Sequence, residues 1–121
     1  MTELTDGQIA RKALDILGSE GQYWTKHQTR WRSTFRGDVV CIAAALFQAA
    51  TGRRSDNIDI CTGGLRPTLH AKLARAMHEH DPAHWYWDEG VDTARLVGFN
   101  DYQGTTFDDI RVILEKVAAE G

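Results

Sequence analysis

The sequence predicts a mostly α-helical fold. We expect residues 1–121 to form a small, single-domain orthogonal bundle of about four helices around a buried central helix (38–51), with long loops. The length of 121 residues suits one domain. Two segments, 6–17 and 106–117, repeat apolar residues at helical spacing behind capping signals. A third, 39–47, is apolar around its whole circumference, as expected of an interior helix, and few or no strands are expected.

The first and last helices begin at recognisable caps. Thr5 with Gln8 forms a capping box, in which each side chain satisfies the other residue's free amide, and Gly18 ends the first helix. Thr106 with Asp109 repeats the pattern at the last helix. The apolar stripes that should face the core are Ile9, Ala13, Leu14 and Leu17 in the first helix and Phe107, Ile110, Leu114 and Val117 in the last.

The central helix is expected to start at Asp38, a favourable N-cap residue, and to stop at Gly52. The flanking segments, 19–37 and 53–64, lack a clean apolar period and are interpreted as loops.

A further helix should begin at Pro67, the favoured first-turn proline, and stop at Pro82. Its predicted inner face is Leu69, Leu73, Ala76, Met77 and His80. Residues 91–99 suggest a short helix that buries Ala94, Leu96, Val97 and Phe99.

The charge distribution divides the chain in two. The net charge is −3, but residues 1–78 contain eleven Lys and Arg against seven Asp and Glu, whereas residues 79–121 contain three against ten. This split favours one basic and one acidic face. No apolar run approaches the ~20 residues that span a bilayer, and the first residues are polar and acidic. We therefore expect a cytoplasmic protein without a membrane partner, in which Cys41 and Cys61 are free thiols.

Two sequence motifs resemble a known family. They are Gly-Asp-Val-Val-Cys-Ile-Ala-Ala-Ala-Leu at 37–46 and Phe-Asn-Asp-Tyr-Gln-Gly-Thr-Thr-Phe-Asp-Asp-Ile at 99–110. Together they resemble a family of small domains of unknown function found in actinobacteria and their bacteriophages. The resemblance spans roughly residues 9–119 and is weakest over 53–84. It implies an intracellular protein of an actinobacterium or a phage, and it transfers no catalytic residues.

One enzymatic interpretation centres on Cys41. Cysteine hydrolases place the nucleophile at a helix start and a histidine and then Asn or Asp later in the chain, and Cys41, His84 (or His70) and Asn100 follow that order. Five histidines make such an order easy to match, and Asp38 in the same turn would raise the thiol pKa. A small buried apolar role for Cys41 is the favoured reading, with no catalytic residue assigned.

A metal site is not expected, and neither is a cofactor. Structural zinc uses four ligands, usually in tight pairs, whereas His78 and His80 diverge on a helix and Pro82 interrupts the turn between His80 and His84. No Cys-x-x-Cys is present.

The leading interpretation is a non-enzymatic protein-interaction domain, a phage-encoded accessory protein that binds a host protein. Trp85 and Trp87 belong to a run of large rings that a small core does not readily enclose, and exposed rings anchor interfaces; packing at a corner of the core is the other interpretation of this run. The segment 23–36 interleaves aromatic and basic residues, a composition also used for single-stranded nucleic acid, which remains an alternative. The expected partner-binding residues are Trp85, Trp87, Trp31, Arg30, Arg32 and Arg36.

Overall fold

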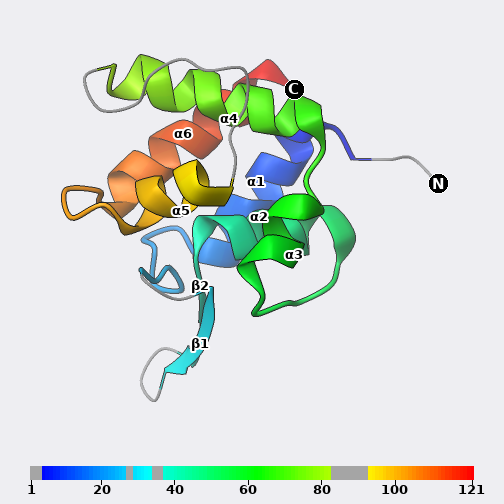
Figure 1. Ribbon diagram of the computed structural model, residues 1–121, viewed down its shortest axis with the longest axis vertical. Coiled ribbons are helices and arrows are strands. Elements are labelled where there is room, and N and C mark those ends of the chain that lie inside the picture. The colour runs from blue at the N-terminus through cyan, green and yellow to red at the C-terminus, as the bar shows by residue number, and fades with distance from the viewer. Residues whose placement is uncertain (1–3, 27–28, 34–36, 83–92) are drawn as a thin grey trace.

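Six helices and one antiparallel hairpin make up the described part of the chain (Figure 1). The computed structural model describes residues 4–26, 29–33, 37–82 and 93–121; at 31–33, 37–38, 93–95 and 97 it describes the backbone alone. The elements are α1 (Asp6–Leu17), β1 (Arg30–Ser33), β2 (Gly37–Val40), α2 (Ile42–Thr51), α3 (Ile58–Gly63), α4 (Pro67–His80), α5 (Thr93–Asp101) and α6 (Phe107–Glu120). The predicted mostly helical class is confirmed, with six helices where about four were expected.

Helix α2 is the centre of the fold, as predicted. It contacts α1, α3, α5 and β2, and every residue from Ile42 to Phe47 is buried. Its short alanine side chains let the neighbouring helices approach closely. Gly52 ends the helix in the left-handed conformation, with φ of 73°.

The terminal helices confirm their predicted caps. In α1 the Gln8 amide donates to Thr5 Oγ1 over 3.1 Å, and the Thr5 amide donates to Gln8 Oε1 over 2.9 Å. In α6 the Thr106 amide donates to Asp109 Oδ2 over 2.7 Å. The apolar stripes bring α1 against both α2 and α6, and α4 against α6, in one shared core.

The predicted start of the central helix at residue 38 is wrong. Residues 37–40 form β2, which pairs with β1 in the register Arg30 to Val40 and Trp31 to Val39. The β-branched Val39 and Val40 suit a strand better than a first helical turn. The N-cap of α2 is therefore Cys41 rather than Asp38, and part of the predicted loop 19–37 is a strand.

The predicted loop 53–64 contains a short helix, α3. Asn57 caps it, because its side-chain oxygen accepts hydrogen bonds from the amides of Asp59 and Ile60. At six residues, α3 is too short to show an apolar period. Helix α5 covers 93–101 where 91–99 was expected; Leu96 and Phe99 are buried, whereas the side chains of Ala94 and Val97 lie outside the described set.

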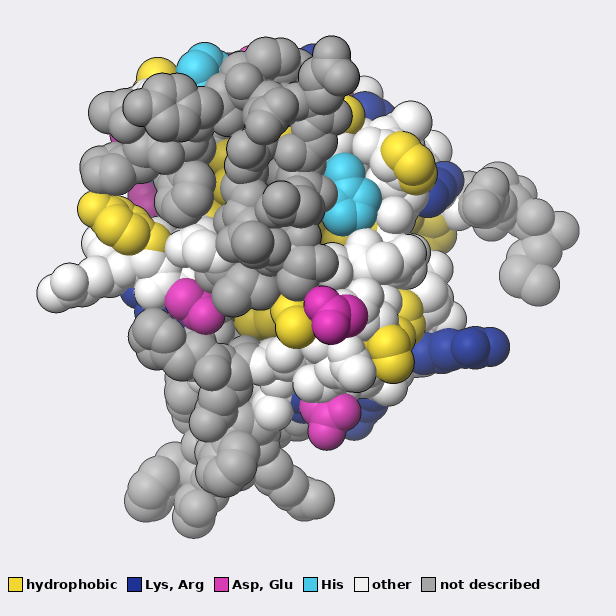
Figure 2. All heavy atoms as spheres, viewed as in Figure 1, with side chains coloured by type: hydrophobic (Ala, Val, Ile, Leu, Met, Phe, Trp, Pro, Cys, Tyr) yellow, Lys and Arg dark blue, Asp and Glu magenta, His cyan; other side chains and the backbone are white. Residues whose placement is uncertain are grey.

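The basic and acidic halves of the sequence meet at an ion pair between two helices. Arg75 Nη1 of α4 lies 3.5 Å from Glu120 Oε1 of α6. On the face in Figure 2, acidic and basic side chains both occur. Across the described ranges, no helix has the length and apolar character that crossing a bilayer requires.

Candidate functional site

The β1–β2 hairpin projects from the helical body (Figure 1). One hydrogen bond closes its base and two others attach it to the rest of the chain. The Cys41 amide donates to the Thr29 carbonyl over 3.0 Å, and the Val40 amide donates to the Tyr23 carbonyl over 2.8 Å. Arg30 Nη2 donates to Gln48 Oε1 of α2 over 2.7 Å. The hairpin is therefore a protruding element with a firmly attached base.

Three of the six expected partner-binding residues lie on β1. Trp31 and Arg32 are in the middle of the strand, where only their backbone is described, and Arg30 stands at its foot. Arg36, Trp85 and Trp87 lie outside the described residues. Arg30 has a structural contact with α2 in addition to any role in binding.

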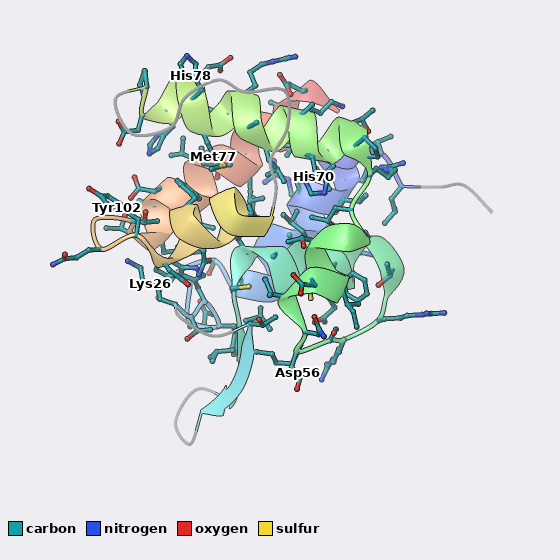
Figure 3. All side chains as sticks on the ribbon, in the orientation of Figure 1. Lys26, Asp56, His70, Met77, His78 and Tyr102 are labelled. Atoms are coloured by element: carbon teal, nitrogen blue, oxygen red, sulfur yellow. The ribbon has the colours of Figure 1, made fainter. Side chains whose placement is uncertain are left out.

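Part of the basic, aromatic segment that precedes β1 packs on the body. Trp24 Nε1 donates to Asn100 Oδ1 over 2.8 Å, and the Trp24 ring lies 6.2 Å from that of Phe107 in α6. Lys26 Nζ lies 5.5 Å from the centre of the Trp24 ring and donates to the Tyr102 carbonyl over 2.7 Å. Figure 3 shows Lys26 and Tyr102 side by side. The segment is thus anchored by Trp24.

Asn100 joins the two sequence motifs in space. Its side chain is 1% exposed, and its Oδ1 accepts from the Ile42 amide over 3.0 Å as well as from Trp24. Its Nδ2 donates to the Thr25 carbonyl and to Asp101 Oδ1. Cys41, the N-cap residue of α2, makes no side-chain cap bond, so Asn100 supplies the missing acceptor from α5. Both the oxygen and the nitrogen of the Asn100 side chain are therefore hydrogen-bonded within the fold.

Cys41 lies at the start of α2 but is shielded. It is 5% exposed, and burial raises the pKa of its thiol to about 11, with the backbone amides of Ala43 and Ala44 lowering it only in part. A nucleophilic cysteine needs the opposite shift. Burial also raises the pKa of the Cys61 thiol.

The histidines are dispersed. In Figure 3, His70 lies on the side of α4 toward α3 and His78 on the outer side, and His70 Nε2 is 3.0 Å from the Thr62 carbonyl. His84 lies outside the described residues. Within the described ranges, no three His, Cys, Asp or Glu residues are grouped in a way that could hold a metal ion.

His80 forms a side-chain pair that sequence reasoning did not anticipate. Its Nε2 lies 2.7 Å from Asp109 Oδ1, at the edge of a hollow of about 100 Å³ that Phe99 and Tyr102 also line. Burial raises the pKa of the Asp109 carboxyl, but hydrogen bonds from Thr106 and His80 outweigh it and leave the pKa below its usual value. The pair ties the end of α4 to the start of α6. Because 29 positions separate His80 from Asp109, no local sequence pattern indicates this pair.

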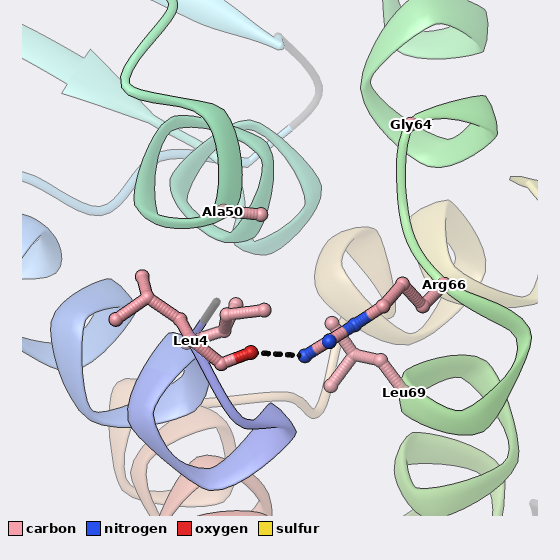
Figure 4. Close-up of a pocket in the computed structure, with 6 residues that line it drawn as sticks. Leu4, Ala50, Gly64, Arg66 and Leu69 are labelled. Atoms are coloured by element: carbon pink, nitrogen blue, oxygen red, sulfur yellow. Dashed lines mark hydrogen bonds between the residues drawn. The ribbon is translucent and has the colours of Figure 1, made fainter. Parts of the chain in front are cut away.

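A second unanticipated cluster surrounds Asp6, which is 5% exposed. Its carboxylate lies 2.9 Å from Arg66 Nη2 and 3.2 Å from Lys72 Nζ. Arg66 also donates to the Leu4 carbonyl over 2.7 Å, beside a hollow of about 130 Å³ that Leu69 also lines (Figure 4). The hollow is small and its guanidinium is already paired, so we interpret the cluster as a clamp between α1 and α4.

Comparison with known proteins places the chain in one family. No curated protein and no solved structure matches it. One family model, described as a family of unknown function (DUF6197), matches residues 1–120, nearly the whole chain. The protein that carries this projecting hairpin and this buried asparagine therefore belongs to the DUF6197 family.

Proposed function

We propose that this chain is a non-enzymatic protein-interaction domain, a phage-encoded accessory protein that acts in the cytoplasm of an actinobacterium by binding a host protein. The observation that carries the proposal is the β1–β2 hairpin. It projects from the helices (Figure 1) and holds Arg30, Trp31 and Arg32, and Trp and Arg are the residue types enriched at the energetic centres of interfaces.

The two alternative functions receive less support. A cysteine hydrolase would need a reactive thiol at Cys41, which is buried and has a raised pKa, and an available side chain at Asn100, which is fully hydrogen-bonded. Single-stranded nucleic acid would need several exposed rings to stack on bases, but Trp24 is packed against Phe107 and covered by Lys26, and Tyr23 is the exposed ring among the described side chains of the segment.

The proposal is tested by capturing a partner and then measuring its affinity. The full chain is immobilised and exposed to an actinobacterial lysate, and the retained protein is identified by mass spectrometry and purified. Two double variants, Trp31→Ala with Arg32→Ala and Trp85→Ala with Trp87→Ala, are compared with the wild type. A matched control is Arg111→Ala, at an exposed arginine of α6.

We expect at least one double variant to weaken binding about tenfold or more, because hot-spot truncations commonly cost about 2 kcal/mol. The control should bind as the wild type does, and circular dichroism should show that all variants fold. Specific retention of no protein, or equal binding by all variants, would overturn the proposal.

A further inference from the structure

The hydrogen bonding of the hairpin fixes which backbone groups of β1 point away from β2. The Cys41 amide donates to the Thr29 carbonyl, and Trp31 is the register partner of Val39. Backbone groups alternate in direction along an antiparallel strand, so those of residues 29, 31 and 33 point toward β2. The N–H and C=O of Arg32 therefore point to the outer edge. Within the described ranges, no backbone hydrogen bond reaches either group.

The two edges of the hairpin differ. On β2 the outward groups of Val40 are occupied, because its amide donates to the Tyr23 carbonyl and its carbonyl accepts from the Thr25 amide over 3.0 Å. The segment 23–25 thus covers the base of the β2 edge. Further out, no backbone bond within the described ranges reaches the outward groups of Arg32 on β1 or of Asp38 on β2, so both stretches of edge can pair with another strand.

We propose that an extended, acidic segment of the partner protein adds to β1 as a third, antiparallel strand, with its backbone bonded to the N–H and C=O of Arg32. This inference rests on the proposed function and specifies the kind of segment that is bound. A hairpin of two four-residue strands is marginal alone, and a third strand stabilises it while supplying main-chain hydrogen bonds for affinity.

The positive charge of the hairpin and its flanking residues favours an acidic partner segment. Residues 21–40 contain Lys26, Arg30, Arg32 and Arg36 against one acid, Asp38, which is the register partner of Arg32 on β2. Charges directly opposite each other on paired strands interact, so an acidic strand is favoured beside Arg32 on β1 and disfavoured beside Asp38 on β2. A second copy of the chain is disfavoured on this edge, because antiparallel pairing of two β1 strands brings arginines near arginines.

The side-chain part of the inference is tested with two fluorescein-labelled peptides, TVEVEVT and TVKVKVT, by fluorescence anisotropy at low salt. We expect the glutamate peptide to bind the full-length protein at least about tenfold more tightly than the lysine peptide. Arg32→Glu should remove or reverse this preference, and Arg111→Glu on α6 should leave it unchanged. Equal binding of both peptides, or binding of neither, would overturn the inference.

The backbone part is tested by proline. Because the Arg32 amide points away from β2, Arg32→Pro removes the docking donor and no ladder bond, and proline is tolerated at such edge positions. Arg32→Ala removes the same charge and keeps the amide. We expect Arg32→Pro to bind the glutamate peptide about tenfold more weakly than Arg32→Ala, and deuterium exchange of the wild-type Arg32 amide to slow when the peptide is bound. Equal affinities or unchanged exchange would exclude strand addition.

A third probe separates the classes of partner. The probe is labelled oligothymidylate. If it displaces the glutamate peptide and is itself released by salt, the hairpin binds nucleic acid and the inference is overturned. A captured host protein that binds Arg32→Pro and Arg32→Glu as well as the wild type would also overturn strand addition, yet it would leave the proposed protein-binding function standing.

Discussion

Replacing Asn100 by alanine removes an amide that serves four partners from a position that is 1% exposed. The Ile42 amide loses its acceptor at the fully buried start of α2, which should cost about 1–3 kcal/mol. Trp24 Nε1 and the Thr25 carbonyl also lose their partner, but both residues are half-buried and water reaches them, so each should cost about 0.5 kcal/mol. The total loss is about 3 kcal/mol.

A loss of this size should lower the melting temperature by roughly 10 °C in a domain of this length. The assay is urea unfolding followed by circular dichroism, with a check that the slope of the unfolding free energy against urea is unchanged. Asn57→Ala is the matched control, because the Asn57 side chain also accepts from the start of a helix, here from two amides of α3, but is exposed. Loss of an exposed N-cap should cost about 1 kcal/mol.

The comparison of the two asparagines decides the role of Asn100. If Asn100→Ala costs no more than Asn57→Ala, the buried amide is not what holds the start of α2, and our account of the joined motifs is wrong.

Three further predictions concern a thiol, an ion cluster and a turn. Cys41 should resist iodoacetamide in the folded protein near about pH 8, because it is 5% exposed and the pKa of its thiol is about 11; rapid labelling seen by mass spectrometry would contradict its burial. Asp6→Asn should cost about 1–2 kcal/mol near about pH 7. The folded pKa of Asp6 lies below its ordinary value of 3.8, so this cost should be full above that value and vanish as the pH falls through the folded pKa; a cost that persists in strong acid would exclude the ion cluster as its cause. Gly21→Ala should destabilise the protein by about 1 kcal/mol more than Gly52→Ala, because both positions have positive φ but only at Gly21 would the new Cβ clash with the Phe107 ring. Equal costs in urea unfolding would show that the ring moves aside without cost.

The elements predicted correctly from the sequence are those whose signals are local. The capping boxes at Thr5 and Thr106 join residues three positions apart, and Gly52 stops α2 through its own backbone freedom. The local signal at Asp38 gave a wrong prediction, because a local signal ignores strand pairing. Asp38 is a good N-cap residue by type, yet strand pairing at Val39 and Val40 placed it outside the helix.

The candidate site could be predicted in composition but not in geometry. The basic and aromatic character of residues 23–36 is visible in the sequence, whereas the hairpin depends on the pairing of two four-residue strands, too short to show a period of two. The bond between Asn100 and Ile42 spans 58 positions, and that between Arg66 and Leu4 spans 62. Contacts at such separations are determined by helix packing and leave no trace in residue spacing.

The Asn100 amide also reaches the root of the hairpin. Its Nδ2 donates a hydrogen bond to the Thr25 carbonyl, and the Thr25 amide donates to the carbonyl of Val40, the last residue of β2. One buried side chain therefore links the foot of the hairpin, the beginning of α2 and the end of α5. For the proposed binding function, a hairpin held at its base in this way has little orientational freedom to lose when a complex forms.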